Sequence, residues 1–252
     1  MSGAWRGVFN RLRRRLAQAL LHRMVFGEVS GGRWLPHTRI APSTCIEHAD
    51  RLSLADHVYI GPFNFIEASG GITLGEGVQI THHVSIVTHS SHRAQRLLGR
   101  AYAAWPSGVQ TCAQTGAQTE RPGWLAGPVT IGPYCFIGPH SLVEAGSRLG
   151  VGCIVRAGSV LRGDYPAHAV IAGNPAVVVG DARQGDVRWL AAHPELRAGY
   201  AAWAGELAEV PLTDAPAGLP AEPPSSLPAG SLADPPSGPP AGPPPGPPET
   251  LR

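Results

Sequence analysis

The 252-residue sequence has few charged residues and contains no lysine: 15% of its residues are charged, and all 20 basic residues are arginine. The formal net charge of +2 is too small to produce the positive field that nucleic-acid binding requires, so we expect no nucleic-acid partner. The absence of any run of 18 apolar residues excludes a membrane-spanning helix. Arg13, Arg14 and Arg15 interrupt the early apolar stretch, which argues against a secretory signal and favours the cytoplasm.

Motifs of several common protein classes are also absent. The sequence has no Walker motif, no GxGxxG and no GxSxG, so nucleotide-phosphate binding and serine-hydrolase chemistry are not expected. The four cysteines show neither CxxC nor the Cys/His spacing of a zinc site; they are Cys45, Cys112, Cys135 and Cys153. We therefore expect no metal and no disulfide framework.

Glycine and proline are abundant but lie in different parts of the chain. Fifteen of the 26 prolines fall in the last 42 residues, whereas 27 of the 32 glycines lie in the first 210. Residues 211–252 consist mainly of Pro, Gly, Ala and Ser and predict a disordered, polyproline-like tail. The glycine-rich remainder excludes collagen, a coiled coil and an ordinary helical bundle, and indicates many regularly placed tight turns.

The middle of the chain carries an internal repeat of six residues. An aliphatic residue starts each repeat, and a small or β-branched residue follows four positions later, with Asn64 as the exception. The aliphatic positions are Leu54, Ile60, Ile66, Leu74, Ile80, Ile86, Ile131, Ile137, Val143, Leu149, Val155 and Leu161. Glycine often follows directly, where we expect it to supply turn conformations. These glycines are Gly61, Gly75, Gly132, Gly138 and Gly150.

A period of six fits neither a helix nor the simple alternation of a strand. It fits short strands that each end in a turn, three of which make an 18-residue triangular coil, and such coils stack as parallel strands. The aliphatic residues then form columns inside the prism, and the small residues fill its corners. Cys135 and Cys153 are expected to lie one above the other as such corner residues.

Two segments outside the repeat are expected to be helical. Residues 3–25, within an N-terminal segment 1–30, have apolar residues on one face, six arginines and no acid. This pattern suits a peripheral anchor on an anionic membrane. The alternative is a helix whose apolar stripe packs on the main domain or on a neighbouring subunit. Residues 183–207 have regularly spaced apolar anchors and predict a C-terminal helix.

The repeat breaks once, between Ser91 and about Pro128. We predict a loop excursion over residues 92–128 of the repeat domain 38–180. A loop of this length inside a compact domain is usually functional or disordered. We therefore look for chemistry where the excursion leaves the repeat.

Three motifs after the excursion carry a family resemblance: IGPYCFIG at 131–138, RAGSV at 156–160 and AGNPA at 172–176. Over residues 38–180 the chain resembles the hexapeptide-repeat O-acetyltransferases, which include maltose, galactoside, xenobiotic and surface-polysaccharide acetyltransferases. The resemblance implies an all-β fold, a left-handed parallel β-helix, accompanied here by the N-terminal helix, the excursion, the C-terminal helix and the tail. It also implies a homotrimer, acetyl-CoA as co-substrate and a hydroxyl acceptor.

The resemblance further implies a histidine general base at the end of a coil strand where an extended loop departs. An imidazole is suited to this role because it titrates near neutral pH. The Asn-His-Arg motif of the xenobiotic acetyltransferases aligns with residues 91–93 and favours His92. The sugar acetyltransferases place their base between the two candidates, so His89 is the alternative. We expect the other histidine to line the pocket.

The sequence departs from the family at several positions. Gly123 replaces the glutamate that the sugar acetylases carry before the returning coil, which leaves Glu120 and Glu67 as carboxylates that could assist the base. Gly163 replaces the usual lysine after the final coil, although the adjacent Arg162 could meet a CoA phosphate. The residues that the resemblance assigns to cofactor binding are Arg156, Ala157, Gly158, Ser159, Arg162, Ala172 and Gly173.

The resemblance therefore implies an acetyl-CoA-dependent O-acetyltransferase in which the acceptor attacks the thioester directly. We expect the acceptor to be a sugar hydroxyl of a surface polysaccharide or of its lipid-linked precursor, met at the inner membrane face. The alternative is a non-catalytic β-helix that serves as an assembly scaffold. Two histidines at the loop departure favour the enzyme, because a scaffold requires no such cluster.

Overall fold

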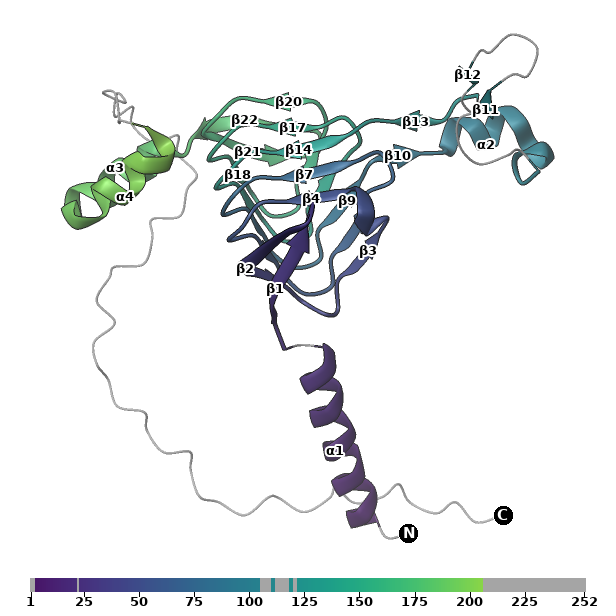
Figure 1. The fold of residues 1–252 in the computed structure, drawn as a ribbon, viewed down its shortest axis with the longest axis horizontal. Helices are drawn as coiled ribbons and strands as arrows, with labels where there is room; N and C mark the ends of the chain where they lie inside the picture. Colours follow the sequence, from purple (N-terminus) through teal and green to yellow (C-terminus); the bar gives the residue numbers. More distant parts are fainter. Residues whose placement is uncertain (1–2, 22, 105–109, 112–117, 120–121, 206–252) are drawn as a thin grey trace, which may run out of the picture. The chain divides into compact units, whose positions relative to one another are not determined.

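The computed structural model describes residues 3–21, 23–104, 110–111, 118–119 and 122–205 (Figure 1). The predicted tail at 211–252 and the candidate carboxylate Glu120 lie outside the described residues.

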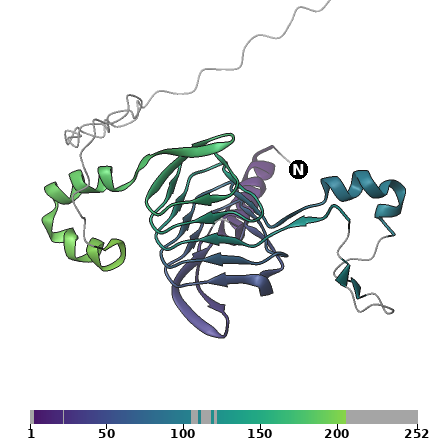
Figure 2. The ribbon, with the colours of Figure 1, turned by 90° about the horizontal axis from the view of Figure 1, so that it is seen from above.

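Three sheets of parallel strands form the body of the protein, and the chain visits them in turn. The first contains β2 (Arg33–Ile40), β5 (Tyr59–Ile60), β8 (Gln79–Ile80), β15 (Phe136–Ile137), β18 (Ile154–Val155) and β21 (Ala169–Gly173). The second contains β3 (Cys45–Glu47), β6 (Phe65–Glu67), β9 (Ser85–Val87), β16 (Leu142–Val143) and β19 (Val160–Leu161). The third contains β4 (Leu52–Leu54), β7 (Ile72–Leu74), β14 (Val129–Ile131), β17 (Arg148–Leu149) and β20 (Asp164–Tyr165). Figure 2 shows the resulting stack of coils, which agrees with the predicted β-helix.

Two antiparallel strands lie at the ends of the first sheet. β1 (Val25–Ser30) pairs with β2, and β22 (Ala176–Asp181) pairs with β21. The six-residue repeat gave no indication of either hairpin, because each lies beyond the region in which the repeat is regular.

The repeat positions form the core, as predicted. Eleven of the twelve aliphatic residues are buried, and Leu54 is half-buried. Asn64, the exception among the small positions, is also buried, and its amide donates hydrogen bonds to the carbonyls of Gly61 and Thr81 at 2.9 and 2.8 Å. Its Oδ1 accepts from Val84 N at 2.7 Å. The asparagine therefore satisfies backbone groups of two successive coils, which explains a polar residue at this corner.

The glycines that follow the aliphatic residues have a different role from the predicted one. The φ of Gly138 lies outside the left-handed region, but a Cβ there would come within 2.6 Å of Val155 O and of Ala157 N on the next coil. The left-handed conformation is instead adopted at the turns by residues such as Phe63, His83 and His140, whose rings stack at 5.2 and 5.0 Å. Glycine is needed at 138 because successive coils approach closely.

Replacing Gly138 with alanine should lower the free energy of unfolding by about 1–3 kcal/mol, because the methyl group meets backbone atoms that cannot move aside. Urea unfolding followed by circular dichroism measures this effect. Gly185→Ala is the control, because no atom lies within 4 Å of its Cβ position in a helix. That variant should be unchanged or more stable by up to about 1 kcal/mol. Equal stability of the two variants would contradict the close approach of the coils.

The predicted coil length of 18 residues does not hold throughout, and the two-residue slip of the repeat between Ile66 and Leu74 marks one of the longer coils. Ile46 pairs with Ile66 and Ile66 with Ile86, so these coils contain 20 residues. Ile137 pairs with Val155 at the predicted spacing of 18. The extra residues of the early coils, 48–51 and 68–71, lie between the second and third sheets. With the three sheets lettered A, B and C in the order given above, this place is the B–C corner.

The excursion leaves from the same B–C corner, between β9 and β14 (Figure 1). It contains β10 (His89–Ser90), α2 (His92–Leu98), the 3-10 helix η2 (Gly99–Tyr102), β11 (Gln110–Thr111), β12 (Gln118–Thr119) and β13 (Leu125–Ala126). β10 pairs with β13 in antiparallel fashion, His89 opposite Ala126. The excursion therefore begins a few residues earlier than predicted, on a two-stranded base that includes His89.

The terminal helices differ in length from the predicted ones. The N-terminal helix α1 covers Gly3–Leu21, and its apolar stripe is exposed rather than packed on the coils. The segment predicted as one helix over 183–207 consists of α3 (Arg183–Ala192), a 3-10 turn η3 (Pro194–Leu196) and α4 (Arg197–Ala204). Pro194 interrupts the helix because it has no backbone N–H to donate and its ring clashes with the preceding turn.

Candidate functional site

The B–C corner brings His89 of β10 against a carboxylate of the preceding coil. His89 Nδ1 lies 2.8 Å from Glu67 Oε2 and 3.1 Å from Ser69 Oγ. The imidazole stacks on the indole of Trp124, with 4.4 Å between ring centroids and 12° between the planes. The His89 side chain is half-buried. These contacts hold the ring in one orientation while part of it still reaches solvent.

Glu67, at the end of β6, is buried and accepts several hydrogen bonds. Ser69 N donates to Oε1 at 2.8 Å, while Thr88 N and Thr88 Oγ1 donate to Oε2 at 3.1 and 2.8 Å. Burial alone would raise the pKa of Glu67, but the hydrogen bonds from Ser69 and Thr88 outweigh it and lower the pKa to about 2. Glu67 is therefore a carboxylate at neutral pH.

An ionised Glu67 determines which nitrogen of His89 carries the proton. A carboxylate can only accept, so neutral His89 donates from Nδ1 and keeps a lone pair on Nε2. The pair thus has the arrangement of a general base that a carboxylate orients.

The lowered pKa of Glu67 also predicts a pH dependence of stability. The carboxylate contributes stability above its ordinary pKa of 4.5, and this contribution is lost as the pH falls toward about 2. Glu67→Gln lacks the titrating group, so its loss of stability relative to wild type should be greater at pH 7 than at pH 3. Thermal unfolding at the two pH values measures this difference. A difference that does not change with pH would contradict the lowered pKa.

His92, which we expected to be the base, occupies a different environment. It is the first residue of α2, its side chain is exposed, and its Nδ1 lies 2.7 Å from Ser90 Oγ. Both candidate histidines therefore lie where the excursion leaves the coils. Within the described residues, Glu67 is paired with His89 and not with His92.

Gly123, which replaces the family's loop glutamate, has no room for a side chain. Its φ is +74°, and a Cβ would lie 2.8 Å from Ala94 N and 3.0 Å from Leu97 Cδ1 of α2. The carboxylate of this site instead comes from the preceding coil. Ser69, Thr88 and Trp124 also contribute to the site, and the sequence alone gave no indication of them.

The residues assigned to the cofactor lie mostly at another corner, between the first and second sheets. Arg156, Ala157 and Gly158 form an exposed turn there, and Arg156 N donates to Ile171 O, next to Ala172 and Gly173. Ser159 is buried, and its Oγ donates to Arg156 O at 2.6 Å, so its side chain points inward.

Arg162 is the exception among the predicted cofactor residues. It lies at the B–C corner, exposed, with its Nε 3.5 Å from Glu144 Oε2. A single chain therefore does not bring the Arg156–Ser159 turn to His89.

Among the described residues, one group could offer three ligand atoms to a metal. Nitrogen or oxygen atoms of His37, Asp56 and His57 lie within 4.8 Å of one another. The Asp56 carboxylate already accepts from His37 Nδ1 and from the backbone N–H of both histidines. The two rings stack in parallel at 4.4 Å, so an ion in the plane of one ring lies outside the plane of the other. Hydrogen bonding accounts for this cluster without an ion.

Sequence relatives of the chain are acetyltransferases. No known family model matches it. A Staphylococcus aureus MRSA252 protein described as an acetyltransferase is 43% identical over 54 residues, 21% of this chain and 27% of that protein. The 2,3,4,5-tetrahydropyridine-2,6-dicarboxylate N-acetyltransferase of Staphylococcus aureus JH9 is 42% identical over 59 residues, 23% of this chain and 25% of that enzyme.

The chain thus spans about a quarter of the length of these curated relatives. Among solved structures, the maltose O-acetyltransferase of Clostridium difficile 630 has a TM-score of 0.41 and 20% identity, over 55% of this chain and 63% of that one. The resemblance to acetyltransferases that the repeat motifs predicted is confirmed by these sequence relatives over the residues that match.

Proposed function

We propose that the protein is an acetyl-CoA-dependent O-acetyltransferase in which His89, oriented by Glu67, is the general base. The observation that carries the proposal is the 2.8 Å contact between His89 Nδ1 and the buried, ionised Glu67 at the point where the excursion leaves the coils. The similarity to acetyltransferases supports the reaction class. The proposal includes a left-handed winding of the coils and a homotrimer.

In the proposed reaction, His89 Nε2 removes the proton of an acceptor hydroxyl as the oxygen attacks the thioester carbonyl. The C–S bond then breaks, and the imidazolium returns the proton to the departing CoA sulfur. Glu67 stabilises the imidazolium while it carries the extra proton, and this stabilisation favours the transition state over the ground state. Trp124 covers one face of the ring. The exposed His92 then lines the pocket.

The separation of the two corners supports the trimer. Because the Arg156–Ser159 turn and His89 lie at different corners of one chain, we propose that the turn of a neighbouring copy completes the site. The backbone amides of this exposed turn and the Arg156 guanidinium suit the phosphates and pantetheine amides of CoA. Arg162, beside the catalytic corner, could then meet a CoA phosphate.

The acceptor that we propose is a sugar hydroxyl of a surface polysaccharide or of its lipid-linked precursor. Such precursors are carried by the membrane, so the enzyme would act at the inner membrane face.

The test is to incubate purified protein with acetyl-CoA and a panel of soluble sugars and to follow release of the CoA thiol, together with calorimetry of CoA binding. We expect CoA binding and sugar-dependent thiol release. Absence of CoA binding would contradict the proposal and favour the alternative, a non-catalytic β-helix that serves as an assembly scaffold. Mass spectrometry of the surface glycan, with and without the gene, then identifies the acceptor by a lost acetyl group.

A further inference from the structure

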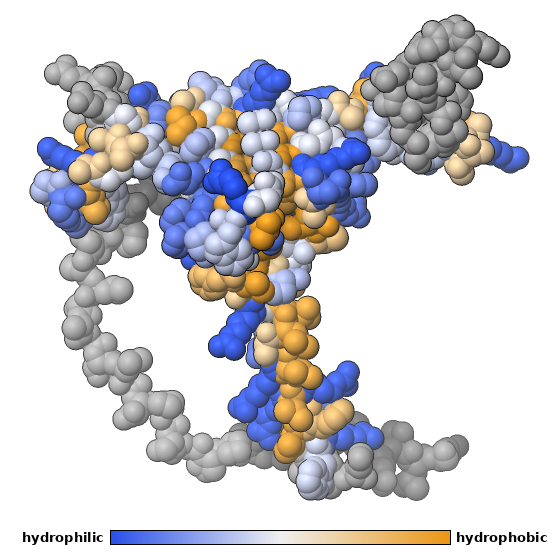
Figure 3. Space-filling model, in the orientation of Figure 1, coloured by the Kyte–Doolittle hydropathy of each residue, from blue (hydrophilic) through white to orange (hydrophobic). Residues whose placement is uncertain are grey.

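The helix α1 carries an apolar stripe that is exposed to solvent. Its residues recur every three or four positions, so they line one face of the helix. They are Trp5, Phe9, Leu12, Leu16 and Leu20, each more than half exposed. Figure 3 shows this stripe as a continuous hydrophobic band along α1. An exposed band of this kind indicates a surface that binds another protein or a membrane.

Arginines border the stripe on both sides. At about 100° per residue, Arg6 and Arg13 lie along one edge and Arg15 along the other, while Arg11 lies further round toward the back. The Arg13 guanidinium lies over the Phe9 ring, 5.7 Å from its centroid. The helix contains no acidic residue. Its apolar face is therefore bordered only by positive charge.

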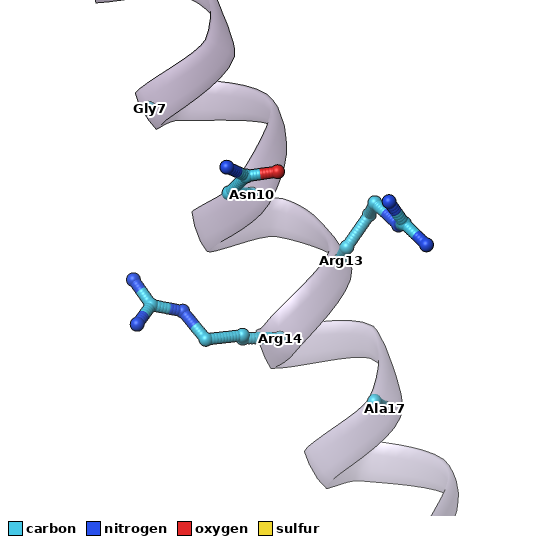
Figure 4. Close-up of a pocket in the computed structure, with 5 residues that line it drawn as sticks. All are labelled: Gly7, Asn10, Arg13, Arg14 and Ala17. Atoms are coloured by element: carbon cyan, nitrogen blue, oxygen red, sulfur yellow. The ribbon is translucent and has the colours of Figure 1, made fainter.

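Beyond the Arg13 edge, the face of α1 is small and polar. A shallow groove there is lined by Gly7, Asn10, Arg13, Arg14 and Ala17. In Figure 4 the side chains of Arg13 and Arg14 point to different sides of the helix. The helix thus has one apolar face, two basic edges and one polar back, which is the pattern of a helix that lies in the plane of a membrane interface.

The β1–β2 hairpin, which begins four positions after Leu21 in the sequence, also exposes apolar side chains. Val29 and Trp34 are cross-strand partners, and both are exposed. The Trp34 ring covers Gly27, where a Cβ would come within 2.2 Å of it. Phe26, on the same strand as Val29, is also exposed. Trp and Phe are favoured where an apolar surface meets lipid headgroups.

We propose that α1 and the exposed residues of the β1–β2 hairpin dock on a bilayer of anionic lipids, with the α1 stripe in the acyl region and the arginines at the phosphates. No described helix is long and apolar enough to cross a membrane. A second copy of the chain fits the surface less well, because pairing two such stripes brings arginine edges against each other. The proposal does not depend on acetyl transfer, although it would place the enzyme beside a lipid-linked acceptor.

The test is co-sedimentation of the full-length protein with vesicles, without acetyl-CoA. We expect binding to phosphatidylcholine vesicles that contain 30% phosphatidylglycerol, weaker binding at high salt, and little binding to pure phosphatidylcholine. Leu16→Glu on the stripe should lower the partition coefficient by about 10- to 100-fold, the factor expected for one buried leucine. Gln18→Glu adds the same charge on the back of the helix and should lower it only about fivefold.

Other outcomes would overturn the proposal. Equal losses for Leu16→Glu and Gln18→Glu would show that the stripe does not enter the bilayer. Equal binding to neutral and anionic vesicles would refute the role of the arginines. Absence of vesicle binding, with a smaller oligomer for Leu16→Glu, would assign the stripe to a second copy. Trp34→Ser in the wild-type protein should also weaken vesicle binding. Unchanged binding by this variant would refute the docking of the β1–β2 hairpin on the bilayer.

Discussion

Replacing His89 with alanine is expected to lower kcat by about 10²- to 10⁴-fold, the range that a positioned general base contributes. His89 is the histidine whose Nδ1 is held by a buried carboxylate, and its removal leaves the acceptor hydroxyl without a base. CoA binding should be nearly unchanged. Thiol release at saturating acetyl-CoA, with the most active acceptor of the sugar panel, gives the rate.

His92→Ala is the matched control, because it removes the same side chain three residues further along the chain. His92 is exposed and contacts Ser90, so we expect a loss of a few-fold in kcat or a change in the KM of the acceptor. The reverse result, an inactive His92→Ala and an active His89→Ala, would contradict the assignment of the base and restore the choice that the sequence alone favoured.

Replacing Glu67 with glutamine is expected to lower kcat on the order of 100-fold. The amide has nearly the same shape but no charge, so it no longer stabilises the imidazolium. It can also donate to Nδ1 of His89, which would move the proton to Nε2 and remove the basic lone pair. The KM for acetyl-CoA should change little, because Glu67 lies inside the coil and not on the cofactor turn. Steady-state kinetics separate the two parameters.

Glu76→Gln makes the same chemical change at another position, where the carboxylate accepts a hydrogen bond from Tyr134 at 3.1 Å. This variant should keep the wild-type rate. A Glu67→Gln enzyme with wild-type kcat would show that the carboxylate only supports the fold.

The six-residue repeat predicted the core because equivalent positions of the repeat occupy the same place in every coil. An aliphatic residue that recurs at every strand must point to the same side of every coil, so the burial of residues such as Ile60, Ile80 and Ile137 follows from the period alone. The roles of glycine did not follow from it, because the sequence cannot distinguish a residue that turns the chain from one that lets two coils approach.

The carboxylate that pairs with His89 was harder to predict for a related reason. An 18-residue coil places residue 85 above Glu67, whereas the observed 20-residue coil places Val87 there, two residues before His89. The two extra residues lie at the B–C corner, where the Glu67 carboxylate contacts His89. They are visible in the sequence as the interval of eight between Ile66 and Leu74. The family resemblance directed attention to His92, because it aligns residues by motif and not by hydrogen-bonding partner.

If Glu67 orients His89 as the base, the His89 proton lies on Nδ1, and two-bond ¹H–¹⁵N NMR of protein with ¹⁵N-labelled histidine measures its position. The His89 signals are assigned by their loss in His89→Ala. At neutral pH, in the fraction of molecules with a neutral ring, we expect a proton on Nδ1 and a bare Nε2, and a change of this pattern in Glu67→Gln. A neutral His89 with its proton on Nε2, unaffected by Glu67→Gln, would contradict the proposed base.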